Sequence, residues 1–537
     1  MTISLSIPLW ILSAFPIVFL IGVMVARNWP ASKAAPITLC ITIVSAIVFF
    51  RMNLSAVVVE SGKGIWSAVS ILLVVWPALL LYEMSNQVHA FQVLRRSLDH
   101  FTAHKLMQII LLGWIFPSFL QGITGFGVAV AVGAPLLVSI GVAPLWSVVI
   151  VLLCHSWGGT FGTLAIAWQA LLTQVNVSED TAAMAAFIAC ILIWLYNFVA
   201  GLLLAWFYGK WAAVKEGFPV ILLISVVQGG GQLLFSQINS TISCFLPACI
   251  SMLVAIAACR TPKYHRKWEI ESGIMTSVPE QSTEGKPISF VQALFPYIIL
   301  TVLAITCLLI SPLNQLLKQW RVGFPFPASV TGYGYETPAE ACFSPLTPLT
   351  FAGTFLMLSV VIGCLYYGKI GVITRKSLRS IWKRTVQKAA SSSVAILSLL
   401  VLSRIMSSSG QIYVLSRGIA QILGSSYLFV ASLVGMVGSF VTSSNMSSNI
   451  LFGSFQTQMA EFLGLNASLL MGAQTAGGVI GTAFAPGNVI LGTSTTGLSG
   501  QEGKIIRKVL PVALSMALID GLVILVFGKC GFPFGNL

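Results

Sequence analysis

Apolar residues along this chain gather in long runs, most of them about as long as a helix that crosses a lipid bilayer, about 20 residues. Uncharged runs of this length predict spanning helices rather than the amphipathic helices of a soluble domain. Such runs lie at 7–26, 36–50, 65–83, 143–170, 182–208, 219–236, 241–259, 290–311, 349–368, 390–406, 465–490 and 509–528. The pattern therefore predicts about 12 spanning helices.

Two further apolar segments, 106–140 and 426–463, are interrupted in the middle by Gly-rich or hydroxyl-rich stretches at 121–127 and 442–449. Each half is only about 15 residues long, which is short for a full crossing. Lipid tolerates broken backbone only where protein encloses it or where it lines a cavity. We therefore expect an all-α polytopic membrane protein with two re-entrant helical hairpins in addition to the spans.

The order of elements repeats along the chain. A span, an amphipathic stretch, a hairpin and two spans follow one another in 65–208 and again in 390–528, and 209–389 supplies connecting spans and loops. A G-G-x-x-G-T pattern stands at the same place in both units, at 158–163 and 477–482. Paired breaks at corresponding positions of two halves mark the binding site in many secondary transporters. The sequence thus predicts one transmembrane transporter domain, 1–537, with two repeat units.

Basic residues set the orientation, because Lys and Arg concentrate in cytoplasmic loops. The segments 260–287 and 369–388 are rich in Lys and Arg, and we expect both to be cytoplasmic loops. The loop 312–348 and both termini then lie outside. The span at 65–83 runs inward and the span at 390–406 runs outward, so the two units are predicted to be inverted.

Composition agrees with a protein that lives in a lipid bilayer. Apolar residues make up 57% of the 537 residues and charged residues 8%, whereas soluble proteins carry about 25% charged residues. The net charge of +14 comes from short loops, so it does not indicate nucleic-acid binding. The ten Cys are scattered without a C-x-x-C pair, and neither a metal nor a cofactor is expected. A phosphate loop, H-E-x-x-H and G-x-S-x-G are all absent from the sequence, so neither ATP-driven transport nor hydrolysis is indicated.

The interruptions suit a small organic anion. The half-helix that returns from a tip presents free backbone N–H groups and the positive end of its dipole. Two such tips offer a carboxylate several donors without a buried cation, and hydroxyl and amide side chains add to them. For any single Gly, tight helix packing is the alternative explanation. The predicted substrate-binding residues are Gln121, Gly122, Thr124, Gly125, Gly127, Gly158, Gly159, Ser443, Ser444, Asn445, Ser447, Ser448, Asn449, Gly477 and Gly478.

Titratable groups within spans are scarce, so each is a candidate for coupling transport to an ion, H⁺ or Na⁺. His155 stands just before the first Gly pair and could titrate near neutral pH. Asp520 lies in the last span, and Glu83 lies near the end of its span. Glu83 and Arg404 occupy corresponding positions in the two units, so they could pair with each other or reach opposite interfaces.

Three segments resemble the bacterial L-lactate/glycolate permease family. The stretch 119–127, F-L-Q-G-I-T-G-F-G, resembles F-L-E-G-A-A-G-F-G of that family. The stretch 443–449, S-S-N-M-S-S-N, resembles G-S-D-T-S-S-N, and 475–481, T-A-G-G-V-I-G with Pro486 after it, resembles T-T-G-G-V-T-G … S-P-Q.

The resemblance implies uptake of L-lactate, glycolate or a similar 2-hydroxy monocarboxylate by proton symport across a bacterial inner (plasma) membrane, and a permease rather than an enzyme. The chain departs from the family at Gln121, where the family has Glu, at Asn445, where it has Asp, and at Thr482, where it has Lys. If the family acids relay the proton, this protein must use His155, Glu83 or Asp520, couple to Na⁺, or work uncoupled.

Two alternatives stay open. A Na⁺-coupled carrier of dicarboxylates or other anions fits the same hairpins, because unwound carbonyls can coordinate Na⁺. A membrane-embedded enzyme would need paired acids or a metal cluster at one depth. The sequence offers only isolated Glu83, His155 and Asp520 for that role.

Overall fold

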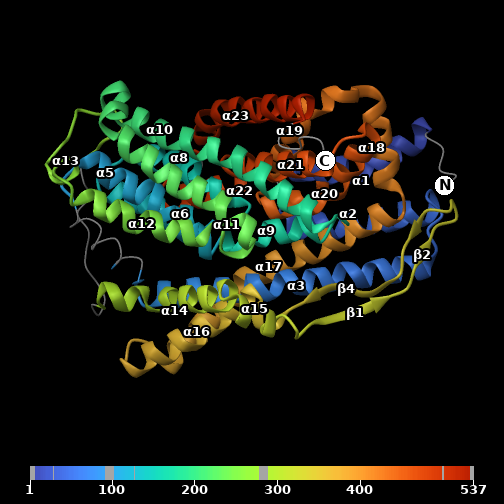
Figure 1. Cartoon of the computed structure of the whole chain (residues 1–537), viewed down its shortest axis with the longest axis horizontal. Helices are drawn as coiled ribbons and strands as arrows, with labels where there is room; N and C mark the ends of the chain where they lie inside the picture. The colour runs from blue at the N-terminus through green and yellow to red at the C-terminus, as the bar shows by residue number, and fades with distance from the viewer. Residues whose placement is uncertain are drawn as a thin grey trace.

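The computed structural model describes residues 6–27, 29–90, 93, 102–125, 127–276, 288–498 and 501–531. Within these ranges eleven helices are long and apolar enough to cross a membrane, and a bent pair of helices makes twelve if it counts as one span. The fold is dominated by helices, as Figure 1 shows. The predicted polytopic helical class is confirmed, although several boundaries differ.

The first half of the chain combines long helices with short, broken ones. Its α-helices are α1 (Ile7–Arg27), α2 (Ala31–Val48), α3 (Leu54–Gln87), α5 (Lys105–Ile110), α6 (Phe116–Ile123), α7 (Val128–Ser139), α8 (Pro144–His155), α9 (Gly162–Leu172), α10 (Glu179–Ser225), α11 (Gly231–Ile238), α12 (Phe245–Cys259) and α13 (Pro262–His265). Tighter or wider turns connect some of them: η1 (Leu111–Ile115), η2 (Ser156–Gly159), η3 (Val226–Gly230) and η4 (Ser240–Ile242).

The second half adds a small amount of β-structure before its helices. Its elements are α14 (Phe290–Leu309), α15 (Ser311–Leu317), β1 (Val322–Phe326), β2 (Ser329–Val330), β3 (Glu336–Thr337), β4 (Glu340–Leu346), η5 (Pro348–Thr350), α16 (Ala352–Lys369), α17 (Arg375–Ser408), α18 (Gln411–Leu423), η6 (Gly424–Ser426), α19 (Tyr427–Thr442), α20 (Asn445–Leu463), α21 (Ala467–Thr482), α22 (Pro486–Thr495) and α23 (Glu502–Cys530).

The long loop 312–348 is the exception to the all-α prediction. Strand β1 pairs antiparallel with β4, and β2 pairs antiparallel with β3. The ribbon that they form lies along α3, where the indole N–H of Trp66 donates to the carbonyl of Phe343 at 3.1 Å. The helix-length apolar pattern carries no signal for such short strands, whose aromatic residues pack on a neighbouring helix.

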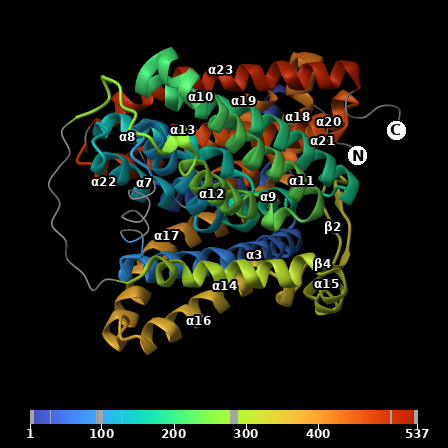
Figure 2. The ribbon, with the colours of Figure 1, turned by 60° about the vertical axis from the view of Figure 1, so that its left-hand side comes forward.

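A peripheral layer, made of α3, α14, α15, α16, β1 and β4, lies along one side of the other helices (Figures 1 and 2). Helix α3 packs against α17 and the two run antiparallel. Near one end Glu83 Oε1 lies 2.5 Å from Lys388 Nζ. Near the other end, a Cβ on Gly64 would lie 2.7 Å from the Cα of Val401. Gly64 therefore sets the close approach of these two long helices.

Both interrupted segments fold as helical hairpins. In the first, a Cβ on Gly133 of α7 would lie 2.8 Å from the ring of Pro117 in α6, so the two arms run side by side. In the second, the hydroxyl of Ser448 in α20 donates to the carbonyl of Gly435 in α19 at 2.9 Å. The turn of the second hairpin passes through Ser443, whose φ is +57°.

Two predicted spans, 143–170 and 465–490, are not continuous. The first is broken between α8 and α9, which meet at 54°. The Gly158-Gly159 pair lies in the 3-10 turn at this break, where the lack of side chains lets the backbone leave the α conformation. The second ends as α21 at Thr482 and resumes as α22 at Pro486, because Pro lacks the N–H that would continue the helix.

Two other boundaries differ from the prediction. The spans expected at 182–208 and 219–236 are joined in α10, which kinks at Gly209 and Lys210. The basic segment 369–388, expected to be a loop, mostly forms the first turns of α17. Of the amphipathic stretch expected at 85–100, residues 91, 92 and 94–100 lie outside the described residues.

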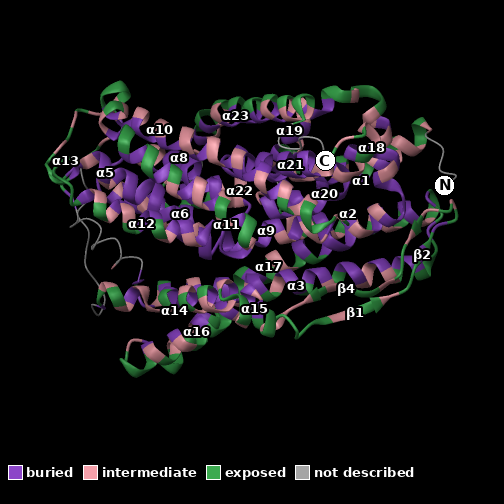
Figure 3. Cartoon of the chain, in the orientation of Figure 1, coloured by how far each residue is buried: buried purple, intermediate pink, exposed green. Residues whose placement is uncertain are grey.

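Burial separates a dense interior from an apolar surface. Buried residues concentrate in the helices that surround the two hairpins, whereas exposed residues lie on outer helices such as α14, α16 and α23 (Figure 3). Many exposed residues are large and apolar, for example Val302 on α14 and Leu522 on α23. A contiguous apolar exterior of this kind suits contact with lipid.

Candidate functional site

The two hairpin tips meet at one cavity of about 310 Å³. Nine of the residues predicted from the sequence line it: Gln121, Gly125, Gly127, His155, Gly159, Ser443, Ser444, Asn445 and Ser447. The two stretches 121–127 and 442–449, which are far apart in the sequence, are thus brought together by the fold. The cavity lies where four helices are broken.

Among the helices that begin at the wall of this cavity are α7, α20 and α22. Gly127 precedes α7, Ser444 precedes α20, and Gly487 lies in the first turn of α22. The hydroxyl of Ser444 accepts a hydrogen bond from the N–H of Ser447 at 3.2 Å, and that of Ser443 accepts one from the N–H of Gly487 at 2.9 Å. The positive ends of three helix dipoles therefore converge on the cavity.

Polar side chains behind the tips hydrogen-bond the broken helices to one another. The amide of Asn445 donates to the hydroxyl of Thr160 at 3.0 Å and to the carbonyl of Thr475 at 3.2 Å. The amide of Asn449 donates to the hydroxyl of Thr475 and to the carbonyl of Ala167, both at 2.9 Å. These bonds tie the start of α20 to α21 and to the α8–α9 break. Because all these groups are buried, losing one donor leaves an acceptor unsatisfied.

One close contact explains a glycine at the first tip. Gly125 has a φ of +57°, and a Cβ there would lie 2.0 Å from the hydroxyl oxygen of Thr163. A side chain at this position would be strained and would also push the first tip away from α9.

The other predicted binding residues lie behind the cavity wall. Within the cavity lining that the structure describes, Gly122, Thr124, Gly158, Ser448, Asn449, Gly477 and Gly478 do not appear. Gly477 and Gly478 pack instead: a Cβ on Gly477 would lie 1.9 Å from the carbonyl oxygen of Ser432, and one on Gly478 would lie 1.8 Å from Oδ1 of Asn445. These two glycines permit the close packing of α21 against α19 and the second tip.

The three coupling candidates lie in different places. His155 lines the cavity, and its Nδ1 lies 2.7 Å from the carbonyl of Val151. A carbonyl only accepts hydrogen bonds, so Nδ1 carries the proton. Asp520 is buried in α23 away from the cavity lining, and neither of its oxygens has a hydrogen-bond partner among the described residues.

Glu83 is an ion-pair residue at one end of the α3–α17 pair. Its carboxylate lies 2.5 Å from Lys388 Nζ and 3.9 Å from Arg384 Nε. Arg404 lies at the other end of α17, where it donates to the carbonyl of Thr173 and stacks over the ring of Phe343. The conceivable Glu83–Arg404 pair is therefore not formed, because the antiparallel helices carry the two groups to opposite ends.

Several lining residues were not predicted. The start of α2 contributes Pro30, its N-cap, and Ala31 and Ser32, and the middle of α17 contributes Ser391 and Ser392. The Ser391-Ser392-Ser393 run inside an apolar span is a polar interruption that pattern analysis could have flagged. Nothing in the local sequence of 30–32 indicates contact with the tips.

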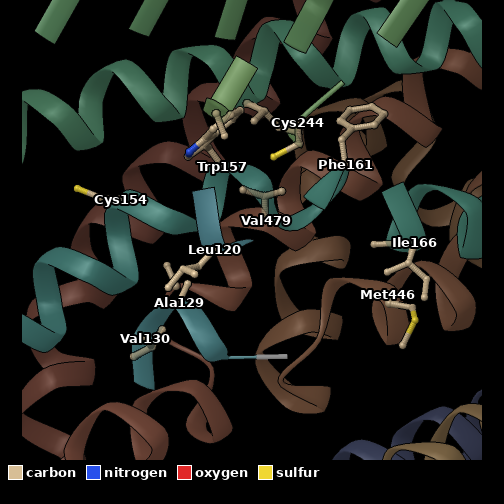
Figure 4. Close-up of a cluster of buried hydrophobic side chains, with 14 of the residues drawn as sticks. Leu120, Ala129, Val130, Cys154, Trp157, Phe161, Ile166, Cys244, Met446 and Val479 are labelled. Carbon is tan, nitrogen blue, oxygen red and sulfur yellow. The ribbon is translucent and has the colours of Figure 1, made fainter. Parts of the chain in front are cut away.

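Apolar packing supports the break between α8 and α9. Trp157 is fully buried, and its indole N–H donates to the hydroxyl of Ser118 at 2.8 Å. Figure 4 shows Trp157 with Phe161, Cys244 and Val479 among the buried side chains of this region. These large groups fill the space that the glycines leave open, so the break is a packed feature rather than a frayed one.

The polar groups that line the cavity are mainly neutral hydrogen-bonding groups. Among its described lining residues there is no Asp, Glu, Lys or Arg, and His155 is the one titratable side chain. The described residues also contain no group of three or more His, Cys, Asp or Glu that could hold a metal ion. Such a cavity can hold an anion through amides, hydroxyls and helix dipoles.

Comparison with known proteins gives matches over nearly the whole chain. The family described as L-lactate permease matches residues 10–529. Glycolate permease GlcA of Escherichia coli (strain K12) is 26% identical and covers 96% of this chain and 95% of its own. The L-lactate permease of Halalkalibacterium halodurans is 24% identical over 94% of each chain. Among solved structures, the Alcanivorax borkumensis YdaH transporter has a TM-score of 0.49 and 13% identity, covering 90% of this chain and 89% of its own, a likeness too weak to carry an argument.

Proposed function

The chain belongs to the L-lactate permease family, and on this premise we propose that it imports L-lactate, glycolate or a similar short 2-hydroxy monocarboxylate. The family match confirms the resemblance seen in the sequence. Together with eleven or more candidate spans and bacterial permease relatives, it identifies a multi-pass protein of the bacterial inner membrane.

The cavity between the hairpin tips is the observation that carries the proposal. Converging helix starts at Gly127, Ser444 and Gly487 offer positive dipole ends to one carboxylate. Hydroxyl and amide groups of Ser443, Ser447 and other tip residues can pair with a 2-hydroxyl. A dicarboxylate would bring a second negative charge, and the described lining holds no Lys or Arg to balance it. The arrangement therefore favours a monocarboxylate.

We assign proton coupling to His155, because it is the titratable group among the described lining residues. With Nδ1 held by a backbone carbonyl, Nε2 is the position that gains and loses a proton. Gln121 and Asn445 stand where the resembling family has acids, so a histidine takes over the role of those carboxylates. The alternative is Na⁺ held by carbonyl and hydroxyl oxygens at the tips.

The arrangement of the two repeat units supports transport by alternating access. Helices α3 and α17 open the two units and run antiparallel, as inverted repeats require. The hairpins and broken helices then move relative to the α3–α17 pair and expose the cavity to one side at a time.

Uptake by purified protein in liposomes tests the proposal. Radiolabelled L-lactate, glycolate, pyruvate and a four-carbon dicarboxylate are supplied with an inside-alkaline pH gradient, with the gradient collapsed, and with Na⁺ replaced by choline. We expect accumulation of the 2-hydroxy monocarboxylates that depends on the pH gradient and not on Na⁺. Accumulation of the dicarboxylate alone, or accumulation that stops in choline, would show the alternative to be correct.

Cysteine labelling tests the orientation. Cysteines placed at His265 and at Ser380, in a chain whose exposed Cys40, Cys342 and Cys530 are replaced by Ser, should react with an impermeant thiol reagent only after the cells are opened. Both positions lie in basic segments that we predict to be cytoplasmic. Ready labelling in intact cells would reverse the orientation.

A further inference from the structure

A second cavity lies on the other side of α9 from the tip cavity. It has a volume of about 330 Å³ and is bounded by α9, α3, η4, the end of α14, Lys318 after α15, and the chain from the end of β4 to the start of α16. It reaches the loop 312–348 through Lys318 and Thr347. Ile166 of α9 lines both cavities. Substrate on the two sides of α9 would therefore be separated by the side chains of one short segment.

The lining of this second cavity suits a small hydroxy-carboxylate. It contains Ser70, Gln169, Asn239, Thr241 and Thr347, which offer hydroxyl and amide groups, and one cation, Lys318. No Asp or Glu occurs among its described lining residues. A polar cleft with one sign of charge raises the local concentration of an oppositely charged ligand.

A neighbouring cavity has the opposite balance of charge among its lining residues. The space around Arg404 is lined by Glu60, Glu336, Glu340 and Glu461, so its acids outnumber its cations and an anion is repelled there. Of these two cavities, the one at Lys318 has a cation and no acid among its described lining residues.

The wall between the tip cavity and the Lys318 cavity has an unusual backbone. Thr163, Leu164 and Ala165 have φ values of +51°, +54° and +64°, in the left-handed region. Residues other than Gly adopt this backbone region at an energetic cost, and three such residues in succession are rare. Strain of this kind persists only when the surrounding structure imposes it, and it often marks a segment that changes conformation.

Ile166 completes the wall. It follows the strained residues directly and is buried beside Met446 of the second tip, as Figure 4 shows. Rotation of this turn into the right-handed form would move Leu164 and Ile166, which are the apolar groups of the partition. The strained segment thus coincides with the place where the two cavities meet.

We propose that the cavity at Lys318 is a loading site for the 2-hydroxy monocarboxylate on the side of the loop 312–348, and that the segment 163–166 is the partition between this site and the tip cavity. The inference rests on the proposed function, because it takes the same substrate class. It adds a second binding position and a route to the function proposed above.

Protection of a cysteine placed in the loading site tests the inference. Thr241→Cys is made in the chain that lacks the three exposed cysteines and is treated from the loop side with an impermeant, negatively charged thiosulfonate. The same chain with Thr241 intact gives the background from the remaining cysteines. We expect modification that saturating L-lactate slows at least about fivefold, while neutral acetamide has no effect.

Charge variants show whether Lys318 is responsible. Lys318→Glu should raise the L-lactate concentration needed for half-protection about 3- to 10-fold, and Lys318→Arg should leave it near the original value. Arg321→Glu is the matched control, because Arg321 is exposed on the same loop but does not line the cavity. Absence of modification from the loop side, absence of protection, or an equal effect of Arg321→Glu overturns the loading site.

Failure of the proposed function and failure of the loading site give different experimental results. If the unmodified protein in liposomes accumulates no 2-hydroxy monocarboxylate, the substrate assignment itself is wrong. If it accumulates L-lactate normally while the Thr241→Cys variant shows no protection, only the loading site is wrong.

Discussion

The substitution Ala165→Gly tests whether the partition formed by residues 163–166 changes conformation during transport. Ala165 has φ +64° and ψ +28° and is fully buried. A left-handed residue with a Cβ is less stable than Gly there by about 1–2 kcal/mol, so Gly stabilises the observed conformation. In a right-handed helical turn, Gly is instead less stable than Ala by about 1 kcal/mol.

This helix propensity is measured against the unfolded chain, so it is the same in both folded conformations and does not enter their equilibrium. Relief of the left-handed strain alone shifts the equilibrium by about 1–2 kcal/mol toward the observed state, a factor of about 5 to 30. The lost methyl group, about 0.8 kcal/mol if it is buried in both conformations, cancels from this difference. If the partition must rearrange in each transport cycle, L-lactate turnover should fall by up to about 30-fold.

Turnover in liposomes and the midpoint of thermal unfolding are measured for this variant and for Ala170→Gly. Ala170 is a fully buried residue of α9 beyond the left-handed turn, so it loses the same methyl group without relief of strain. We expect Ala170→Gly to unfold at a lower temperature with turnover near that of the unmodified protein. We expect Ala165→Gly to show a smaller fall in the unfolding temperature, because relief of strain offsets the lost methyl group, together with reduced turnover. Unchanged turnover in a stable Ala165→Gly protein would refute the reasoning, because the left-handed turn would then be static.

Three further predictions concern the tip cavity and the helix packing behind it. Ser444→Leu should abolish L-lactate uptake while the protein remains in the membrane, because it removes the acceptor for the Ser447 N–H and fills the cavity; normal uptake would remove the second tip from the site. His155→Gln should lose accumulation driven by a pH gradient but retain exchange of internal for external L-lactate; full accumulation would exclude His155 from coupling. Gly477→Ala should lower the thermal midpoint markedly, because its Cβ would lie 1.9 Å from the Ser432 carbonyl, whereas Gly503→Ala, where the added Cβ meets no atom within 4 Å, should not.

The hairpins could be predicted because interruption of an apolar run is a local signal. Polar and Gly-rich residues at 121–127 and 442–449 are hard to place in lipid, so the sequence alone located the two tips. The same signal was misinterpreted in 143–170 and 465–490, where glycines and Pro486 were present but the flanking runs were long enough to suggest one span. The length of these apolar runs was given more weight than the glycines and Pro486 within them. The structure shows that these residues break the helices.

Side-chain direction could not be predicted in the same way. Gly158 and Gly159 are neighbours, yet only Gly159 lines the cavity. Gly477 and Gly478 share a motif with them but pack against Ser432 and Asn445. Which atoms face a cavity depends on how the helices are rotated about their axes, and that rotation is set by packing between segments far apart in the chain.

The sequence by itself determined the membrane class, the number of spans within one or two, the positions of the two tips and the resemblance to a permease family, because each of these follows from local composition or a short motif. Only the tertiary structure decided that the start of α2 at Pro30–Ser32 and the serines of α17 reach the site, that Glu83 pairs with Lys388, and that a second cavity adjoins the first across α9. These features depend on contacts between distant segments, and no local pattern specifies which distant segments will meet.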